Sequence, residues 1–273
     1  MNRSTSSLPL PLRLAVDIPW PIKRKILTNP QAWRFFAGGC RRLGWSDNCL
    51  GWYEARNGPY AGIRLHARHR NHLWVPMGGF EPEISDTIAG LIERGKPAWD
   101  VGANVGIVAL LMANHGASEV LAFEPDQFNY SILLDQVQAN PQLSHRVQPV
   151  RVAVSNYCGQ VSFISNGASE SHIASPEEAN GKAIQCVTLD SILEKRPAPA
   201  FVKVDVEGAE VPVLEGASKL LSEFRPTFLI EVHSREKCAE CLRILNAGRY
   251  DVRCLDWRDQ NNGHVLATPR SKE

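Results

Sequence analysis

Strand-like and helix-like segments alternate from about residue 83 onward, and this alternation limits the fold more than any other feature of the chain. Short apolar runs such as "PAWDVG" and "EVLAFEP" are each followed by a longer segment with helical periodicity, as in "GIVALLMANHG" and "QFNYSILLDQVQAN". Parallel strands need long crossover connections, which are usually helices. The pattern therefore predicts an α/β domain with a mostly parallel sheet and helices on both of its faces.

Three segments are predicted to depart from this alternation. "GQVSFISN" and "AIQCVTLDSIL" read as an extra hairpin, and "YDVRCLDW" with "GHVLATP" reads as an antiparallel pair at the sheet edge. Residues 165–183 are poor in apolar side chains. Loops of this length are often functional lids, although a loop without a role fits the composition equally well.

Residues 1–77 precede the alternation and are predicted to form an extension of a domain that spans residues 78–273. Within it, "NPQAWRFFAGG" reads as a helix with Asn29 as the N-cap and Gly38-Gly39 as the stop. Residues 50–77 read as a hairpin around the turn signal Asn57-Gly58-Pro59. Residues 1–45 mix basic and apolar side chains with a single acid, Asp17. This mixture suits either peripheral contact with an anionic membrane or a packed helix with a solvated basic face.

Charge and cysteine content narrow the classes of function. Lys and Arg number 30 against 29 Asp and Glu, so the formal net charge of +1 gives no global field for nucleic acid. No apolar run approaches the roughly 20 residues of a membrane span. The seven cysteines are an odd number at irregular spacing, which predicts a reduced, cytoplasmic protein. Cys238 and Cys241 form a C-x-x-C in a helical pattern, which favours a helix face over zinc. No oligomeric state is predicted.

The first strand–helix junction, "DVGANVG" at residues 100–106, is where such sheets bind charged small molecules. Gly102 and Gly106 let the backbone approach a ligand, and the helix start supplies free N–H groups. The order differs from the dinucleotide fingerprint, because Asp100 precedes the glycines and Asn104 replaces one. A carboxylate here suits an ammonium group better than a pyrophosphate.

The second strand ends at Glu124 in "LAFEPD", roughly 20 residues further on, where an acid can hold the two hydroxyls of a ribose. An amino group and a ribose together point to S-adenosylmethionine (SAM). The alternative is a tight strand–helix turn with an unrelated surface acid.

The chain resembles the FkbM-type SAM-dependent methyltransferases from "GGFEPEI" (78–84) to "IEVHS" (230–234). The shared markers include "DVGANVG" (100–106), "FEPDQFN" (123–129), "VAVSNYCGQVSF" (152–163), "TLDSIL" (188–193) and "VKVDVEGAEVPVLEGA" (202–217). The resemblance implies a class I, Rossmann-like methyltransferase fold with a seven-stranded sheet and SAM as cofactor. It also implies O-methylation of a hydroxyl on a sugar, glycolipid or secondary metabolite.

Position by position, the resemblance implies roles for several residues around SAM. It implies that the methionine moiety contacts Asp100, Gly102, Asn104 and Gly106. It also implies that Glu124 binds the ribose and that Pro125 packs against adenine. No acid stands at the end of the third strand, where Ala153, Val154 and Ser155 lie instead. Backbone groups or Ser155 are expected to meet the adenine amino group there.

The acceptor side is predicted at the ends of the fourth and fifth strands. In "FVKVDVEGAE", Lys203, Asp205 and Glu207 share one face of a strand. They can act on the acceptor, or Lys203 can pair with an acid while Glu207 begins the next helix, where negative charge is stabilised.

A hydroxyl acceptor needs a base. His233, on the same face as Glu231, is the leading choice, with His172 in the 165–183 loop as the second. A divalent cation on Asp205 and Glu231 is an alternative, but no third ligand is evident and no metal is predicted.

Two other classes of protein remain open from the sequence. A nicotinamide-dependent dehydrogenase would share the fold, but the glycine pattern differs and no Y-x-x-x-K pair occurs. A non-catalytic SAM-binding or membrane-associated partner protein would share the cofactor site. A nucleic-acid methyltransferase is disfavoured because the fourth strand ends in "DVEG" rather than in a D-P-P-Y-like clamp.

Overall fold

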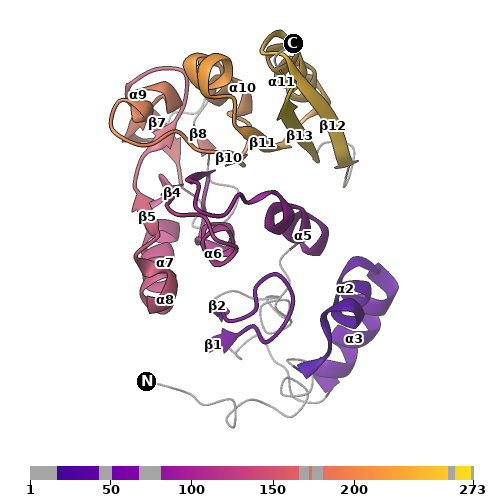
Figure 1. Ribbon diagram of the computed structural model, residues 1–273. Coiled ribbons are helices and arrows are strands. Elements are labelled where there is room, and N and C mark those ends of the chain that lie inside the picture. Colours follow the sequence, from indigo (N-terminus) through magenta and orange to yellow (C-terminus); the bar gives the residue numbers. More distant parts are fainter. Residues whose placement is uncertain are drawn as a thin grey trace.

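The computed structural model describes residues 17–42, 51–67, 81–165, 172–173, 181–257 and 262–271. In this part of the chain, seven strands form one sheet in the order β12-β13-β11-β10-β3-β4-β5 (Figure 1). Five of them run parallel: β3 (Ala98–Val101), β4 (Val120–Phe123), β5 (Val147–Val150), β10 (Phe201–Val204) and β11 (Thr227–Val232). The predicted mostly parallel α/β fold is confirmed.

The expected antiparallel pair is present, but only one of its strands forms the sheet edge. β13 (Gly263–Pro269) lies antiparallel between β11 and β12 (Tyr250–Trp257). The chain therefore runs outward from β3 to β5, returns to β10 on the other side, and reverses direction once, at β13. The point where the order reverses lies between β3 and β10, and ligands of such sheets bind at the carboxyl ends of the strands there.

Helices cover both faces of the sheet, and each face has its own apolar core. Adjacent residues of a strand contribute to different cores, as Ala98 and Trp99 do. One face carries α5 (Pro82–Leu91), α6 (Ile107–Asn114), α7 (Gln127–Gln138) and α8 (Pro141–Ser144). The other carries α9 (Leu189–Leu193), α10 (Glu210–Glu215), the π-helix η2 (Leu220–Phe224) and α11 (Arg235–Ala247). Cys238 and Cys241 are both buried on α11, so the C-x-x-C is a helix face as predicted.

The segment predicted as the third strand is divided between two sheets. β5 ends at Val150, where the Val152 N–H donates to the Val150 carbonyl and turns the chain. The next strand, β6 (Ala153–Val154), belongs to a four-stranded sheet of order β6-β9-β7-β8. This sheet contains the predicted hairpin, β7 (Gly159–Ile164) with β9 (Lys182–Val187). Most of the 165–183 loop lies outside the described residues, apart from β8 (His172–Ile173).

The N-terminal region forms two helices and a hairpin, α2 (Trp20–Thr28), α3 (Pro30–Arg42), and β1 (Gly51–Glu54) with β2 (Arg64–Ala67). The Asn29 side chain accepts hydrogen bonds from the N–H groups of Gln31 and Ala32, which confirms the predicted N-cap. The predicted stop at Gly38-Gly39 is wrong, because α3 continues to Arg42. Burial of Ala37 and Cys40 in the core outweighs the low helix propensity of the two glycines.

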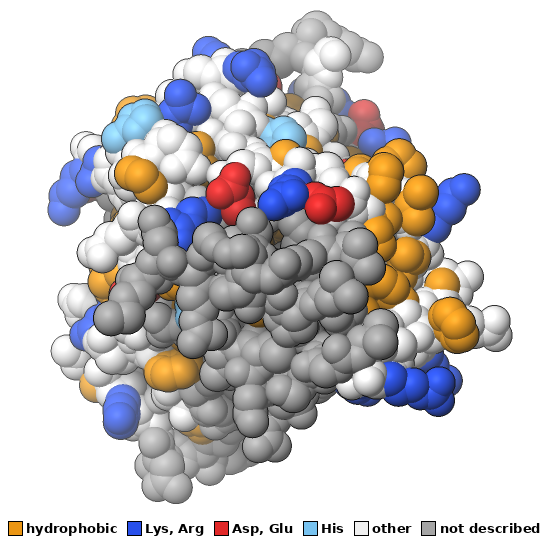
Figure 2. All heavy atoms as spheres, turned by 90° about the horizontal axis from the view of Figure 1, so that it is seen from below, with side chains coloured by type: hydrophobic (Ala, Val, Ile, Leu, Met, Phe, Trp, Pro, Cys, Tyr) orange, Lys and Arg blue, Asp and Glu red, His pale blue; other side chains and the backbone are white. Residues whose placement is uncertain are grey.

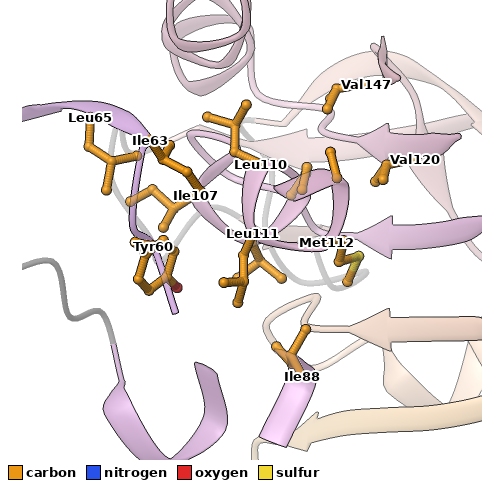
Figure 3. Packing of buried hydrophobic residues seen from close by; sticks show 14 of the residues in the cluster. Tyr60, Ile63, Leu65, Ile88, Ile107, Leu110, Leu111, Met112, Val120 and Val147 are labelled. Atoms are coloured by element: carbon orange, nitrogen blue, oxygen red, sulfur yellow. The ribbon is translucent and has the colours of Figure 1, made fainter. Parts of the chain in front are cut away.

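The hairpin region shares its core with the seven-stranded sheet and its helices. Tyr60, Ile63 and Leu65 are each at most 1% exposed and pack toward Ile107 and Leu110 of α6 (Figure 3). Residues 51–67 thus form a layer that packs on α6, on one side of the sheet.

Among the described residues, no helix has both the length and the apolar character that crossing a membrane requires.

Candidate active site

The turn between β3 and α6 has the backbone shape that its glycines predict. Gly102 and Gly106 both have φ of 83°, and Asn104 has φ of 49°, in the left-handed region that asparagine tolerates better than most residues. A Cβ on Gly102 would lie 1.7 Å from the Asp205 carbonyl oxygen, and one on Gly106 would lie 2.9 Å from Leu133. The glycines are therefore needed for close packing within the protein, a role that the sequence alone did not reveal.

Asp100 is a buried carboxylate beside this turn. The residue is 0% exposed, and neither carboxylate oxygen has a hydrogen-bond partner among the described residues. Burial raises the pKa of Asp100 to about 6, although the charge of Lys203 counteracts this. A buried carboxylate without hydrogen bonds is costly unless a ligand supplies them. Asp100 therefore fits the ammonium group of SAM.

Glu124 joins the glycine turn to the end of β4. One carboxylate oxygen accepts from the Asn104 N–H at 2.7 Å and the other from the Asp126 N–H at 2.8 Å. Burial raises the pKa of Glu124 to about 7, against the effect of these two hydrogen bonds. Each oxygen keeps a second lone pair, so Glu124 can still accept a hydrogen bond from a hydroxyl. Taken together, the orphaned oxygens of Asp100 and the acceptors of Glu124 fit the polar ends of SAM.

The other residues assigned to the adenosine side are placed less directly. Pro125 is partly exposed, immediately after Glu124 at the end of β4. Ser155 is buried, but it follows β6, and its N–H donates to the Val187 carbonyl in the second sheet. The third strand of the main sheet ends at Val150 instead. The expectation that Ala153, Val154 and Ser155 stand at that strand end is therefore wrong.

Lys203 and Asp205 form an ion pair at the end of β10. The Lys203 Nζ lies 2.8 Å from an Asp205 carboxylate oxygen, and the lysine side chain is only 4% exposed. Burial alone would lower the pKa of Lys203, but the charges of Asp205 and Asp100 raise it above its usual range. Lys203 is thus a buried cation between Asp100 and Asp205, as one of the two sequence interpretations anticipated.

Glu207 lies in the turn that follows β10 and does not begin the next helix, which starts at Glu210. Its φ of 46° is unusual for a residue other than glycine, and such strain clusters at functional sites. Its side chain is 31% exposed, so it faces a region that a substrate can reach. Burial raises the pKa of Glu207 to about 7, with His233 opposing the shift.

His233 follows β11 and is held between three carboxylates. Its Nδ1 lies 2.5 Å from the Glu210 carboxylate, and its Nε2 lies 3.3 Å from Glu207 and 3.9 Å from Asp205. Burial lowers the pKa of His233, but the hydrogen bond to Glu210 and the nearby negative charges raise it to about 9. The ring is therefore mostly protonated at pH 7, which does not suit the role of base that the sequence predicts for His233.

The structure separates His172 from this cluster. His172 lies on β8 of the second sheet, where it pairs with Ile164. Glu231 lies 3.4 Å from His264 of β13, its partner in the sheet register. It also follows Ile230, whose partner on β10 is Val204, the residue before Asp205. Its negative charge acts on both Lys203 and Glu207.

Two groups in the described part bring possible metal ligands within 4.8 Å of one another: Asp205 with Glu207 and His233, and Glu81 with Glu231 and His264. In the first group, Lys203 and protonated His233 already balance the negative charge of Asp205 and Glu207, as a metal ion otherwise would. We therefore describe this group as an ion-pair cluster. The cation suggested from the sequence was on Asp205 and Glu231, and these two acids fall in different groups.

The strand order and the polar groups at the β3, β4, β10 and β11 ends define a class: SAM-dependent methyltransferases with the class I fold. A family model, the Methyltransferase FkbM domain, matches residues 100–252, and the chain belongs to this family. Membership implies SAM as the methyl donor and decides against the dehydrogenase alternative.

Two proteins with similarity to the chain show how far the likeness extends. It is 29% identical over 171 residues to the hexuronic acid methyltransferase AglP of Haloferax volcanii, a match that covers 60% of this chain and 68% of that protein. The crystal structure of a methyltransferase FkbM from Methylobacillus flagellatus KT is similar with a TM-score of 0.50 and 19% identity. That match covers 71% of this chain and 52% of the solved one, so the chain spans about half the length of that structure.

Sequence reasoning missed Glu210. It lies in the same "KVDVEGAE" motif as Asp205 and Glu207, and it is 0% exposed. The signal that could have found it is an acid directly before the apolar run "VPVL" at the start of the helix "EVPVLE", because such a run is expected to be buried.

Proposed function

We propose that the chain transfers the methyl group of SAM to a hydroxyl of a sugar. The observation that carries the proposal is the cluster of Asp205, Glu207 and His233 at the same strand ends as Asp100. The Asp205 carbonyl packs against Gly102 of the SAM turn, so an acceptor at the cluster would lie beside the donor. In the reaction the carbon–sulfur bond breaks, a carbon–oxygen bond forms, and the hydroxyl proton passes to a base.

Glu207 is the proposed proton acceptor. Its pKa of about 7 matches the requirement of a base that works near neutral pH. His233, with a pKa of about 9, keeps a positive charge beside Glu207 and so favours the ionised carboxylate. The base role first assigned to His233 therefore passes to the Glu207–His233 pair, in which the carboxylate accepts the proton.

A sugar acceptor is proposed because AglP is named for its action on a hexuronic acid. The test incubates the full chain with SAM carrying a ¹³C-labelled methyl group and either a glucuronic acid glycoside or the matched neutral glucose glycoside. NMR of the product locates the label. A methyl ether on a ring hydroxyl supports the proposal. A methyl ester contradicts it, because an ionised carboxylate needs no base, and absence of transfer to any sugar favours the non-catalytic alternative.

We further propose that residues 1–77 are an extension of the catalytic domain of residues 78–273 and that α2 and α3 contact an anionic membrane. Phe35 is 87% and Ile22 is 53% exposed, with Lys25, Arg34 and Arg42 also exposed on these helices. Figure 2 shows hydrophobic side chains gathered at the right edge of the molecule, with basic side chains above and below them. Basic residues around exposed apolar ones suit such a surface.

Co-sedimentation with vesicles tests the membrane contact. The wild type is expected to bind vesicles that contain anionic lipid, and Phe35→Ser is expected to bind them less. Equal sedimentation with neutral and anionic vesicles would contradict the proposal. Phe224→Ser removes another exposed aromatic side chain, 46% exposed on η2, and serves as the control.

A further inference from the structure

Glu210 is a buried acid whose contacts are directed to one side chain. It is the first residue of α10 and is 0% exposed in the core between α10 and α11. One carboxylate oxygen accepts from the Gly208 N–H at 2.9 Å and lies 2.5 Å from the His233 Nδ1. The other oxygen is buried without a partner among the described residues. Burying a carboxylate is costly unless it is paired. The presence of an acid at this buried position therefore needs a reason.

The surroundings of Glu210 show that the fold tolerates this charge at some cost. Cys241 of α11 is fully buried, and burial together with the negative charge of Glu210 raises the pKa of its thiol to about 12. The remaining buried residues of α10 are the apolar Val213 and Leu214. A leucine would suit this environment better than a carboxylate if Glu210 served packing alone.

The contact determines which ring nitrogen of His233 faces the acceptor side. Because Glu210 takes the Nδ1–H, the Nε2 is directed toward Glu207 at 3.3 Å and Asp205 at 3.9 Å. A histidine whose nitrogen is fixed by a carboxylate keeps one tautomer and one ring orientation. Without Glu210, the ring could turn over and its two nitrogens could exchange places.

We propose that Glu210 is a positioning residue that holds His233 so that its Nε2 faces Glu207. The inference rests on the proposed function in one respect only, that the Glu207–His233 pair receives the acceptor proton. The orientation of the ring can be measured without any acceptor.

NMR of the full chain with ¹⁵N-labelled histidine tests the proposal, with His233→Asn to assign the signals. In the wild type, we expect a far-downfield Nδ1–H proton that exchanges slowly with water, and the Nδ1–H tautomer at pH above about 9. In Glu210→Leu, which has no acceptor for the Nδ1–H, this proton should exchange fast, the other tautomer should appear, and the ring should lose its proton at a pH lower by about 1–3 units. Glu215→Gln, on the exposed end of α10, should leave all three signals unchanged.

A protected Nδ1–H and an unchanged tautomer in Glu210→Leu would overturn the proposal. If that variant does not fold, Glu210→Asp gives the same readout, because its shorter carboxylate should also lose the protected proton.

Kinetics separate positioning from a purely structural role. Glu210→Leu should lower kcat by about tenfold or more while SAM affinity and KM for the acceptor stay within about twofold. Glu210→Gln, whose amide oxygen can still accept from the Nδ1–H, should recover part of kcat. A change of tautomer in a protein that transfers no methyl group would refute the proposed function and leave the positioning intact. Methyl transfer with an unchanged tautomer would refute the positioning alone.

Discussion

The SAM side and the acceptor side of the site are built in different ways. On the SAM side, Glu124 is bound by backbone N–H groups, and Gly102 packs against a backbone carbonyl. On the acceptor side, Lys203, Asp205 and His233 contact other side chains. Residues of the first kind hold the turn after β3 and the end of β4 in place, where we propose that SAM binds. Residues of the second kind determine the charge and proton affinity of their neighbours.

This difference predicts the largest effect for Gly102→Ala. The new Cβ would lie 1.7 Å from the Asp205 carbonyl oxygen at a φ of 83°, so the β3 and β10 ends could not keep their spacing. We expect no folded protein, or a loss of at least about 3 kcal/mol in the free energy of unfolding. Circular dichroism with denaturant titration measures it.

Gly95→Ala is the matched control for this prediction. Gly95 also has a positive φ of 77°, but a Cβ there would meet nothing within 4 Å. The control should lose only about 1–2 kcal/mol, the cost of the left-handed conformation. Equal losses in the two variants would show that backbone conformation, rather than close packing with Asp205, explains the glycine.

On the acceptor side, the largest expected effect is on rate. Glu207→Gln removes the proposed base without changing its size, so kcat should fall by roughly 10²–10⁴. SAM affinity, measured by calorimetry, should stay nearly the same. Glu223→Gln, which removes an exposed carboxylate on η2, should change neither quantity. A loss of only a few fold in Glu207→Gln would remove Glu207 from the reaction.

The two acids of the SAM side should separate binding from stability. Asp100→Asn and Glu124→Gln should each weaken SAM binding by about 1–3 kcal/mol, since each loses a polar contact to the ligand. Glu124→Gln should also lower Tm, because an amide cannot accept from both N–H groups. Asp100→Asn loses no hydrogen bond among the described residues and removes a buried charge, so its Tm should not fall. The opposite pattern of Tm values would contradict the assignment.

A smaller effect is expected from pH on SAM affinity. The pKa of Asp100 is raised to about 6, and only the ionised form attracts an ammonium group. Below pH 6 the carboxyl must release a proton before SAM binds, so affinity should fall by up to about tenfold per pH unit. Calorimetry of the wild type between pH 5 and 8 measures how SAM affinity depends on pH. In Asp100→Asn, the loss of affinity that is caused by protonation of Asp100 should be absent.

The strand–turn–helix segment assigned to SAM could be predicted from the sequence because its signals are local. The order of strand, Asp100, glycines and helix in one short segment fixes where these groups lie, and the structure agrees. The role of Gly102 in packing against Asp205 was not predictable, since the two residues are distant in the chain and meet only through the order of the strands. The end of the third strand was also predicted wrongly. The strand ends at Val150 because the following residues join a second sheet, whose other strands are distant in the chain.

The acceptor side could be predicted only as a set of residues. Strand periodicity placed Lys203, Asp205 and Glu207 near one another, but it could not show which nitrogen of His233 meets which acid. The high pKa of His233 results from three carboxylates within residues 205–210, a segment distant from it in the chain. Proton affinity is a property of the assembled cluster, which is why the proposed base changed once the geometry was known.

The pH dependence of kcat/KM for the acceptor tests the central claim, that Glu207 rather than His233 accepts the proton. The profile of the SAM-saturated wild type is compared with that of Glu207→Gln. With Glu207 as the base, activity should rise with pH through an acidic limb at about pH 7 or lower, since the positive charge of SAM favours the ionised carboxylate. The variant should be slow and should lack this limb. A wild-type limb near pH 9, retained in Glu207→Gln, would assign the base to His233 and contradict the account.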